Sequence, residues 1–225
     1  MNDPKRIVEE GYDAIAERYA MWAPTIKGSP AVEYLERLLE LLPDGSEVLE
    51  LGCGNGEPAA RMLAARHKYT GVDSSREQLR RARTVVPGGD LVHADYTELE
   101  LPAAAYDAVV ALYTFGHVPR EELPSVYGSV ARWLRPGGYL LATTGRRDLP
   151  GEVEDDWLGA PMYFAGYDVE KNLQLLDQAC LAVVAHEVVM QDEGEEGLAG
   201  FLWVLARKPA AEPPDRSGGS ELRRQ

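Results

Sequence analysis

The sequence has few cysteines and few basic residues for its length. Only two cysteines, Cys53 and Cys180, occur among 225 residues, and they provide neither a disulfide framework nor a metal-binding spacing. Lys and Arg together number 23 against 37 Asp and Glu, which gives a formal net charge of −14. This negative charge argues against a nucleic-acid partner, whose phosphates require Lys and Arg to neutralise them.

The sequence also lacks a hydrophobic run long enough to span a bilayer, and no apolar segment follows its polar first residues. We therefore expect no membrane partner and a cytoplasmic location, which the scarcity of cysteine also favours. A chain of 225 residues with 45% hydrophobic residues is expected to form one α/β domain, with room for a cap.

The stretch from residue 48 to residue 56 organises the chain, because an apolar run there ends in three alternating glycines. The run contains a single acid, Glu50, and is typical of a buried strand. The glycines let the backbone turn tightly beside a ligand, and Pro58 suits the first turn of a following helix. The G-x-G-x-G spacing is neither the dinucleotide fingerprint nor a P-loop. Glu50 favours a ligand that carries positive charge, such as S-adenosylmethionine.

Strands and helices alternate through most of the chain. We expect strands near residues 47–51, 69–72, 91–93, 108–112 and 139–143, separated by amphipathic helices. This pattern predicts a parallel sheet covered on both faces. Two more strands, at 181–190 and 198–207, predict an antiparallel hairpin at the sheet edge. The acidic and aromatic segment 145–166 carries no predicted element.

The N-terminal region has the pattern of two helices. The first, over residues 6–22, places Tyr12, Tyr19 and Trp22 on one face, which suits either a core plug or a lid over a pocket. We expect a helical cap at residues 1–44, a cofactor-binding domain at 45–208 and a disordered tail at 209–225, which is rich in Pro, Gly, Ser and charge.

Polar residues follow the expected parallel strands, at the edge where open α/β sheets bind ligands. Asp73 comes after the second strand, where it could accept hydrogen bonds from two ribose hydroxyls. Asp95 comes after the third strand and could accept from an adenine amino group, with Tyr96 beside it. Each aspartate could instead serve only as a helix cap.

Five segments in order resemble the motifs of the class I S-adenosylmethionine-dependent methyltransferases, small-molecule type. They are Glu50-x-Gly52-x-Gly54-x-Gly56, Gly71-Val72-Asp73, Ala94-Asp95, Tyr106-Asp107-Ala108-Val109 and Leu134-Arg135-Pro136-Gly137-Gly138. Tyr12-Asp13-x-x-Ala16-x-x-Tyr19 is also similar to the opening of small-molecule members. The resemblance implies a doubly wound, seven-stranded, mostly parallel sheet in the order 3-2-1-4-5-7-6, with the seventh strand antiparallel.

The resemblance also implies which residues contact the cofactor, S-adenosylmethionine, and its product S-adenosylhomocysteine. The glycine loop and Glu50 would hold the methionine part, Asp73 the ribose and Asp95 the adenine. Tyr113 would line the methyl-donor end. The full set of expected cofactor residues is Tyr12, Tyr19, Glu50, Gly52, Cys53, Gly54, Gly56, Asp73, Ser74, Asp95, Tyr96 and Tyr113. The signatures of amino-group and cytosine-5 DNA methyltransferases are absent from the sequence.

Methyl transfer from a sulfonium is a direct displacement, so alignment and exclusion of water matter most. A base is needed only if the acceptor must lose a proton. His117 is the best candidate for that base, although it could instead be a packing residue before Pro119. The expected acceptor pocket consists of Trp22, His117, Trp157, Met162 and Tyr163. No tight carboxylate spacing predicts a metal site.

The sequence therefore predicts an enzyme that methylates a small molecule, acting as a monomer or homodimer. Three alternatives stay open at this stage. The protein could bind S-adenosylmethionine and catalyse another reaction, such as a cyclisation. It could bind the cofactor without chemistry, or it could methylate a protein or a tRNA.

Overall fold

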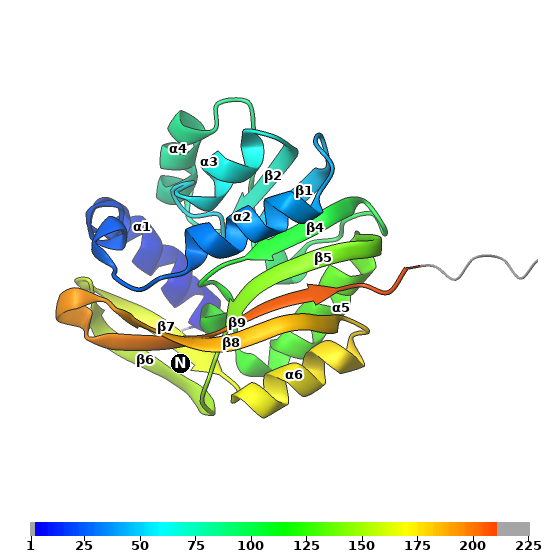
Figure 1. Ribbon diagram of the computed structural model, residues 1–225. Coiled ribbons are helices and arrows are strands. Elements are labelled where there is room, and N and C mark those ends of the chain that lie inside the picture. The colour runs from blue at the N-terminus through cyan, green and yellow to red at the C-terminus, as the bar shows by residue number, and fades with distance from the viewer. Residues whose placement is uncertain (1–2, 211–225) are drawn as a thin grey trace, which may run out of the picture.

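A seven-stranded sheet forms the centre of the fold, with the strand order β3-β2-β1-β4-β5-β9-β8 (Figure 1). The computed structural model describes residues 3–210, so residues 211–225, which hold most of the expected disordered tail, lie outside it. The strands of this sheet are β1 (Glu47–Leu51), β2 (Lys68–Asp73), β3 (Asp90–His93), β4 (Tyr106–Ala111), β5 (Leu134–Thr144), β8 (Ala182–Asp192) and β9 (Leu198–Arg207).

The observed topology confirms the predicted order, since β8 and β9 are the sixth and seventh strands of this sheet. Neighbouring strands from β3 to β5 are parallel, whereas β9 is antiparallel to both β5 and β8. Leu49 in β1 is aligned with Thr70 in β2 and with Val109 in β4. This register brings the carboxyl ends of β1, β2 and β4 to one edge of the sheet.

Helices cover both faces of the sheet, as the continuous apolar strands predict. One face is covered by α2 (Ala31–Leu41), α3 (Ala59–Ala64) and α4 (Arg76–Val85), and the other by α5 (Leu123–Trp133) and α6 (Val169–Gln178) (Figure 1). A hydrophobic core lies on each face of the sheet, and successive β1 side chains point into these two cores alternately. Val48 packs with α2 and α3, and Leu49 packs with α5.

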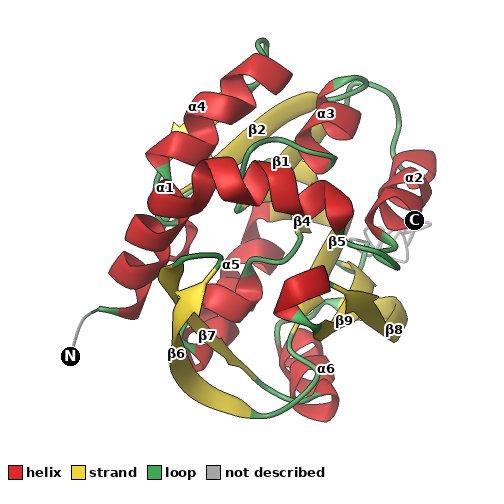
Figure 2. Cartoon of the chain, turned by 90° about the vertical axis from the view of Figure 1, so that its left-hand side faces the viewer, coloured by secondary structure: helices red, strands yellow, loops and turns green. Residues whose placement is uncertain are grey.

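The expected N-terminal cap is divided between two places. The helix α1 (Pro4–Trp22) lies over the strand ends, next to α4 and the β6–β7 hairpin (Figure 2). The second helix, α2, packs on the sheet itself, where Tyr34 stacks on Trp203 of β9 with ring centroids 5.0 Å apart. Only α1 is therefore positioned to cover a ligand.

The segment 145–166, for which no element was predicted, forms an antiparallel hairpin of β6 (Leu149–Trp157) and β7 (Ala160–Gly166). The sequence of β6 lacks the alternation of apolar and polar residues that marks a strand, because nearly all of its side chains are exposed and several are acidic. The β7 strand supplies the buried side, with Met162 fully buried against α1. A Cβ atom on Gly11 of α1 would lie 2.7 Å from the Pro161 carbonyl oxygen, so this glycine permits the close packing.

Candidate active site

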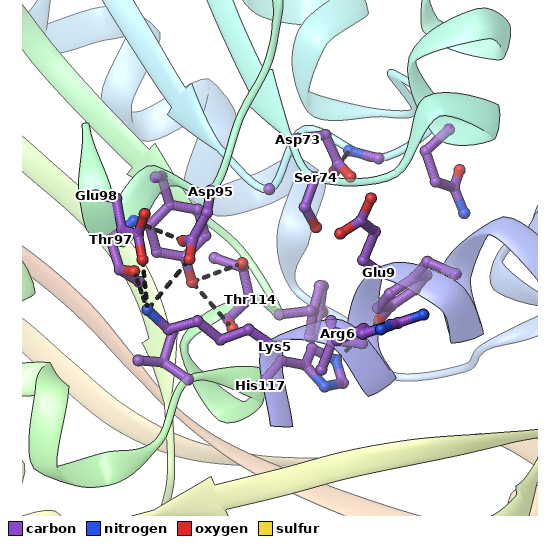
Figure 3. A pocket seen from close by; sticks show the side chains of 18 of the residues that line it. Lys5, Arg6, Glu9, Asp73, Ser74, Asp95, Thr97, Glu98, Thr114 and His117 are labelled. Carbon is purple, nitrogen blue, oxygen red and sulfur yellow. Dashed lines mark hydrogen bonds and ion pairs between the residues drawn. The ribbon is translucent and has the colours of Figure 1, made fainter. Parts of the chain in front are cut away.

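A cavity of about 380 Å³ lies between α1 and the carboxyl ends of β1 to β4. Figure 3 shows Asp73, Ser74 and Asp95 on the sheet side, and Lys5, Arg6 and Glu9 entering from α1. The cavity is lined by Asp3, Lys5, Arg6, Val8, Glu9, Tyr12, Tyr19, Gly52, Gly54, Asp73, Ser74, Gln78, Asp95, Tyr96, Thr97, Glu98, Leu112, Tyr113, Thr114, His117 and Val118. Ten of the residues predicted to contact cofactor or acceptor are among them.

Asp73 joins the glycine loop to the start of α4. Its carboxylate accepts one hydrogen bond from the Gly54 N–H and one from the Ser75 N–H, both 2.8 Å long. Burial raises the pKa of Asp73 to about 6, although these two hydrogen bonds oppose the rise. Ser75 is the N-cap of α4, whereas Asp73 fixes the glycine loop and lines the cavity.

The glycine loop needs its glycines at this point. Gly52 has a φ of +66°, and its N–H donates to the Val72 carbonyl at 2.8 Å. A Cβ at Gly52 would meet the Thr114 side chain, coming within 2.6 Å of its Cβ atom. At Gly52 the chain thus turns back against β2 and the segment after β4, with no room for a side chain.

Asp95 lies in a network centred on Lys5 of α1. Its carboxylate accepts a hydrogen bond from the Thr97 N–H at 2.8 Å and pairs with the Lys5 ammonium at 3.2 Å. Lys5 also donates to the Thr97 hydroxyl at 2.7 Å (Figure 3). It pairs in addition with Glu122 at 2.8 Å. These contacts tie the first turn of α1 to the loops that follow β3 and β4.

A second contact holds the middle of α1 over the cavity. Asp13 accepts hydrogen bonds from the Ser75 hydroxyl at 2.6 Å and from the Glu77 N–H at 3.1 Å. Because the first N–H groups of a helix have no partner within the helix, Asp13 completes the N-terminus of α4. The adjacent Tyr12 lines the cavity.

His117 is held between α1 and β7. Its Nδ1 lies 2.9 Å from the Tyr163 carbonyl oxygen, which can only accept, so Nδ1 carries the hydrogen. Its Nε2 lies 2.8 Å from the Tyr12 hydroxyl and accepts from it. Burial lowers the pKa of His117 to about 4, and the imidazole is therefore neutral at physiological pH.

Tyr96 and Tyr113 both line the cavity, with their hydroxyls engaged. Tyr96 donates to the Thr114 carbonyl at 3.3 Å and accepts from the Thr114 hydroxyl at 3.0 Å. The Tyr113 hydroxyl lies 2.6 Å from that of Ser29 in the loop before α2. Tyr113 has a φ of +58°, a left-handed conformation that is costly for a bulky residue and common at functional sites.

Three of the expected cofactor residues, Glu50, Cys53 and Gly56, do not line the cavity. Glu50 is only 4% exposed and accepts a hydrogen bond of 2.6 Å from the Tyr69 hydroxyl. Burial raises its pKa to about 8. Glu50 is therefore placed to support the loop from within the core.

The residues expected to bind the acceptor, apart from His117, lie behind the cavity rather than in it. Trp22, Trp157 and Met162 pack with Tyr12, Tyr19 and Phe164 in an aromatic cluster between α1 and the hairpin. Trp157 is in edge contact with Tyr12, their ring centroids being 5.8 Å apart. Tyr163 is buried and contributes its carbonyl oxygen to His117. Their assignment to an acceptor pocket stays a prediction.

Several lining residues were not predicted from the sequence. Gln78 of α4 is 1% exposed and lines the cavity, yet neither atom of its amide has a hydrogen-bond partner within residues 3–210. Its position in the first turn of the helix that begins directly after Asp73 and Ser74 was the available signal. Lys5 and Glu9 gave no such signal, since they meet the cavity through the docking of α1. Thr97 lies in the turn that follows Asp95, on the sheet side of the cavity.

Within residues 3–210 no three His, Cys, Asp or Glu side chains gather as a metal site would require. In the same part of the chain, every helix is too short or too polar to cross a membrane.

The chain is similar to several methyltransferases. Residues 48–138 match the family described as "Methyltransferase domain". The chain is 34% identical over 155 residues to 27-O-demethylrifamycin SV methyltransferase from Amycolatopsis mediterranei. This match covers 59% of this chain and 56% of that protein. It is 32% identical over 149 residues to fatty-acid O-methyltransferase from Mycolicibacterium smegmatis, with coverages of 60% and 53%.

The structure also resembles that of 1,6-didemethyltoxoflavin-N1-methyltransferase from Burkholderia thailandensis, solved with 1,6-didemethyltoxoflavin and S-adenosylhomocysteine bound. The TM-score is 0.68 at 19% identity, over 93% of this chain and 92% of that one. At this identity the likeness shows a common fold. The chain spans little more than half the length of the two curated relatives, 56% and 53%.

Proposed function

We propose that this chain methylates a small molecule, because residues 48–138 match the methyltransferase domain family and its motifs resemble those of the S-adenosylmethionine-dependent methyltransferases. S-adenosylmethionine is the cofactor, and S-adenosylhomocysteine is its product. The observation that carries the proposal is the Asp73 carboxylate, which bridges the Gly54 and Ser75 N–H groups while lining the cavity.

The cavity suits the cofactor along its length. The sheet order places the ends of β3, β2, β1 and β4 side by side, and Asp95, Asp73, the glycine loop and Tyr113 follow these strands in turn. In this arrangement Asp95 and Tyr96 receive the adenine, Asp73 the ribose, and Gly52 and Gly54 the methionine backbone. The methyl-donor end then lies next to Tyr113 and His117, against α1.

The chemistry rests mainly on alignment. The nucleophile's lone pair forms the bond to the methyl carbon, while sulfur keeps the electron pair of the broken C–S bond. The chain orients the two partners and excludes water by closing α1 over the strand ends. For His117 to act as a general base, Tyr12 would first have to release its Nε2 atom.

Purified protein incubated with methyl-labelled S-adenosylmethionine and an acceptor panel tests this function. The panel contains 27-O-demethylrifamycin SV, a long-chain fatty acid, and extracts of small metabolites, proteins and tRNA. We expect S-adenosylhomocysteine to form together with a labelled small molecule. Label in protein or tRNA would contradict the small-molecule acceptor. Binding of the cofactor without S-adenosylhomocysteine formation on any acceptor would favour the non-methylating alternatives.

A further inference from the structure

We propose that Tyr12 is the catalytic residue that receives the incoming nucleophile, and that His117 is a positioning residue acting through it. This inference rests on the proposed methyl transfer. The sequence assigned Tyr12 to cofactor binding and His117 to general base catalysis. The geometry changes both roles: Tyr12 receives the acceptor, and His117 orients the Tyr12 hydroxyl.

The direction of the hydrogen bonds carries the argument. The Tyr163 carbonyl fixes the Nδ1–H tautomer of His117, because a carbonyl offers no hydrogen. Nε2 then bears a lone pair and receives the Tyr12 hydrogen at 2.8 Å. The hydroxyl hydrogen of Tyr12 is thereby committed to His117 and cannot be donated to a ligand. Its oxygen can still accept a hydrogen bond from a ligand.

The surroundings of His117 do not suit a general base. Among the described residues no carboxylate bonds the imidazole, whose two nitrogens contact the Tyr163 carbonyl and the Tyr12 hydroxyl. Trp157 and Phe164 flank its ring with centroids 6.3 Å and 5.0 Å away. These contacts keep the imidazole neutral and in place, which suits a group that orients a neighbouring hydroxyl.

The position of Tyr12 selects the acceptor rather than the cofactor as its partner. The Tyr12 hydroxyl bonds His117, which follows β4, whereas the next residue of α1, Asp13, bonds the start of α4 beside the proposed ribose contact, Asp73. The Tyr12 ring also touches Trp157 of the aromatic cluster. Its oxygen is thus at the junction between the methyl-donor end and the apolar side of the site.

The expected partner is a nucleophile that still carries hydrogen, namely a hydroxyl or an amine. Tyr12 accepts its X–H hydrogen, which leaves the nucleophile's lone pair free to point at the methyl group. After the C–X bond forms and sulfur takes the electron pair of the C–S bond, the proton of the methylated product passes to water. His117 exchanges no proton with the acceptor.

The first test measures the His117 ring nitrogens by ¹⁵N NMR in the full chain bound to S-adenosylhomocysteine. We expect Nδ1 to be protonated and Nε2 unprotonated, with no titration between pH 6 and pH 8. Tyr12→Phe should shift the Nε2 resonance and leave Nδ1 unchanged. A hydrogen on Nε2, or a titration near neutral pH, would overturn the assignment. This result does not depend on turnover, so it is separable from failure of the methyl-transfer function.

The second test compares single-turnover methyl transfer across pH, with the panel acceptor that wild type methylates. Tyr12→Phe and His117→Ala should each lower the rate by about 10- to 100-fold, as misalignment does, and the double variant should be no slower than either. His117→Gln keeps an acceptor near the Nε2 position and should restore most of the rate. Tyr34→Phe, which removes a partly buried hydroxyl bonded to Glu187, should leave the rate unchanged, because neither residue lines the cavity.

General base catalysis by His117 predicts the opposite pattern. His117→Gln would then be as slow as His117→Ala, and the wild-type rate would rise with pH through one ionisation near neutrality. Tyr12→Phe would in that case cost less than His117→Ala, since it would free Nε2. Any of these three results contradicts the positioning role.

Discussion

Two walls of the cavity are built in different ways. The strand-end wall (residues 52–56, 73–75 and 95–98) is held by backbone groups, such as the Gly54 and Ser75 N–H groups that bind Asp73. The lid wall (α1, supported from behind by β6 and β7) is held by side chains, among them Tyr12 against His117. Asp73 and Gly54 are 19 residues apart, whereas Tyr12 and His117 are 105 apart. The first wall therefore follows from local sequence, and the second from tertiary packing.

This difference explains why we propose that the strand-end wall binds the cofactor and the lid wall selects the acceptor. A wall built from backbone and strand ends is the same whatever the acceptor, and it suits an invariant cofactor. A wall built from aromatic side chains on a helix and an inserted hairpin can differ in shape without disturbing the sheet. Cofactor binding and acceptor choice should therefore respond to different substitutions.

The largest expected effect is at Gly52 in the strand-end wall. Gly52→Ala places a Cβ against Thr114 at a φ of +66°, so we expect S-adenosylhomocysteine affinity to fall by about 100-fold or more, consistent with strain of 1–3 kcal/mol plus the clash. Isothermal calorimetry measures it. Gly45→Ala is the matched control, because Gly45 has a φ of +78° with nothing near its Cβ position. An equal loss of affinity in both variants would show that the contact between residue 52 and Thr114 does not cause the loss.

A smaller loss is expected at Asp73. Asp73→Ala removes a charged hydrogen-bond acceptor worth about 1.5–3 kcal/mol, which corresponds to roughly 10- to 100-fold weaker S-adenosylmethionine binding. The control is Asp168→Ala, since Asp168 caps α6 through the Lys171 N–H at 2.8 Å. It should lower the melting temperature and leave affinity unchanged. The same pattern in Asp73→Ala would mean that Asp73 is only a cap.

The sequence predicted the sheet and most of the strand-end wall because both depend on local signals. Apolar strands alternate with helical stripes, and glycines or aspartates follow the strands directly. It could not predict the β6–β7 hairpin, since the exposed acids of β6 conceal the strand period. It also missed Lys5, whose partner Thr97 is 92 residues away. Sequence also cannot tell a buried acid from one that faces a ligand, so the contact of Glu50 with the cofactor stays a prediction.

The burial of Glu50 has a pH signature. Its folded-state pKa of about 8 is raised from the ordinary 4.5, so the native state binds an extra proton between these values. This contribution is fully present below pH 4.5 and is lost as pH rises through 8. Glu50→Gln cannot lose a proton. The variant should therefore gain stability relative to wild type as pH rises from 5 to 8, by at most about 1.4 kcal/mol per unit.

Urea unfolding of both proteins at pH 5, 6, 7 and 8 measures this gain. The difference between the variants cancels the titration of groups that both share. A constant difference across this range would show that Glu50 is ionised in the native state. Such a carboxylate would have to face the cavity or a cation, as the resemblance implies.

The smallest expected effect concerns Lys5 in the lid wall. Its ammonium pairs with Asp95 and Glu122, but its side chain is 25% exposed and those of its partners 30% and 39%. Ion pairs of this exposure contribute about 0.2–1 kcal/mol, so Lys5→Met should weaken S-adenosylhomocysteine binding by about two- to fivefold. Hydrogen exchange should quicken over residues 4–12 and remain unchanged in α6. Lys68→Met is the control, because the Lys68 ammonium pairs with the Glu47 carboxylate at 2.8 Å and neither residue lines the cavity.

Wild-type α1 should also exchange more slowly when S-adenosylhomocysteine binds. Equal protection with and without ligand would show that α1 is a fixed part of the core rather than a lid.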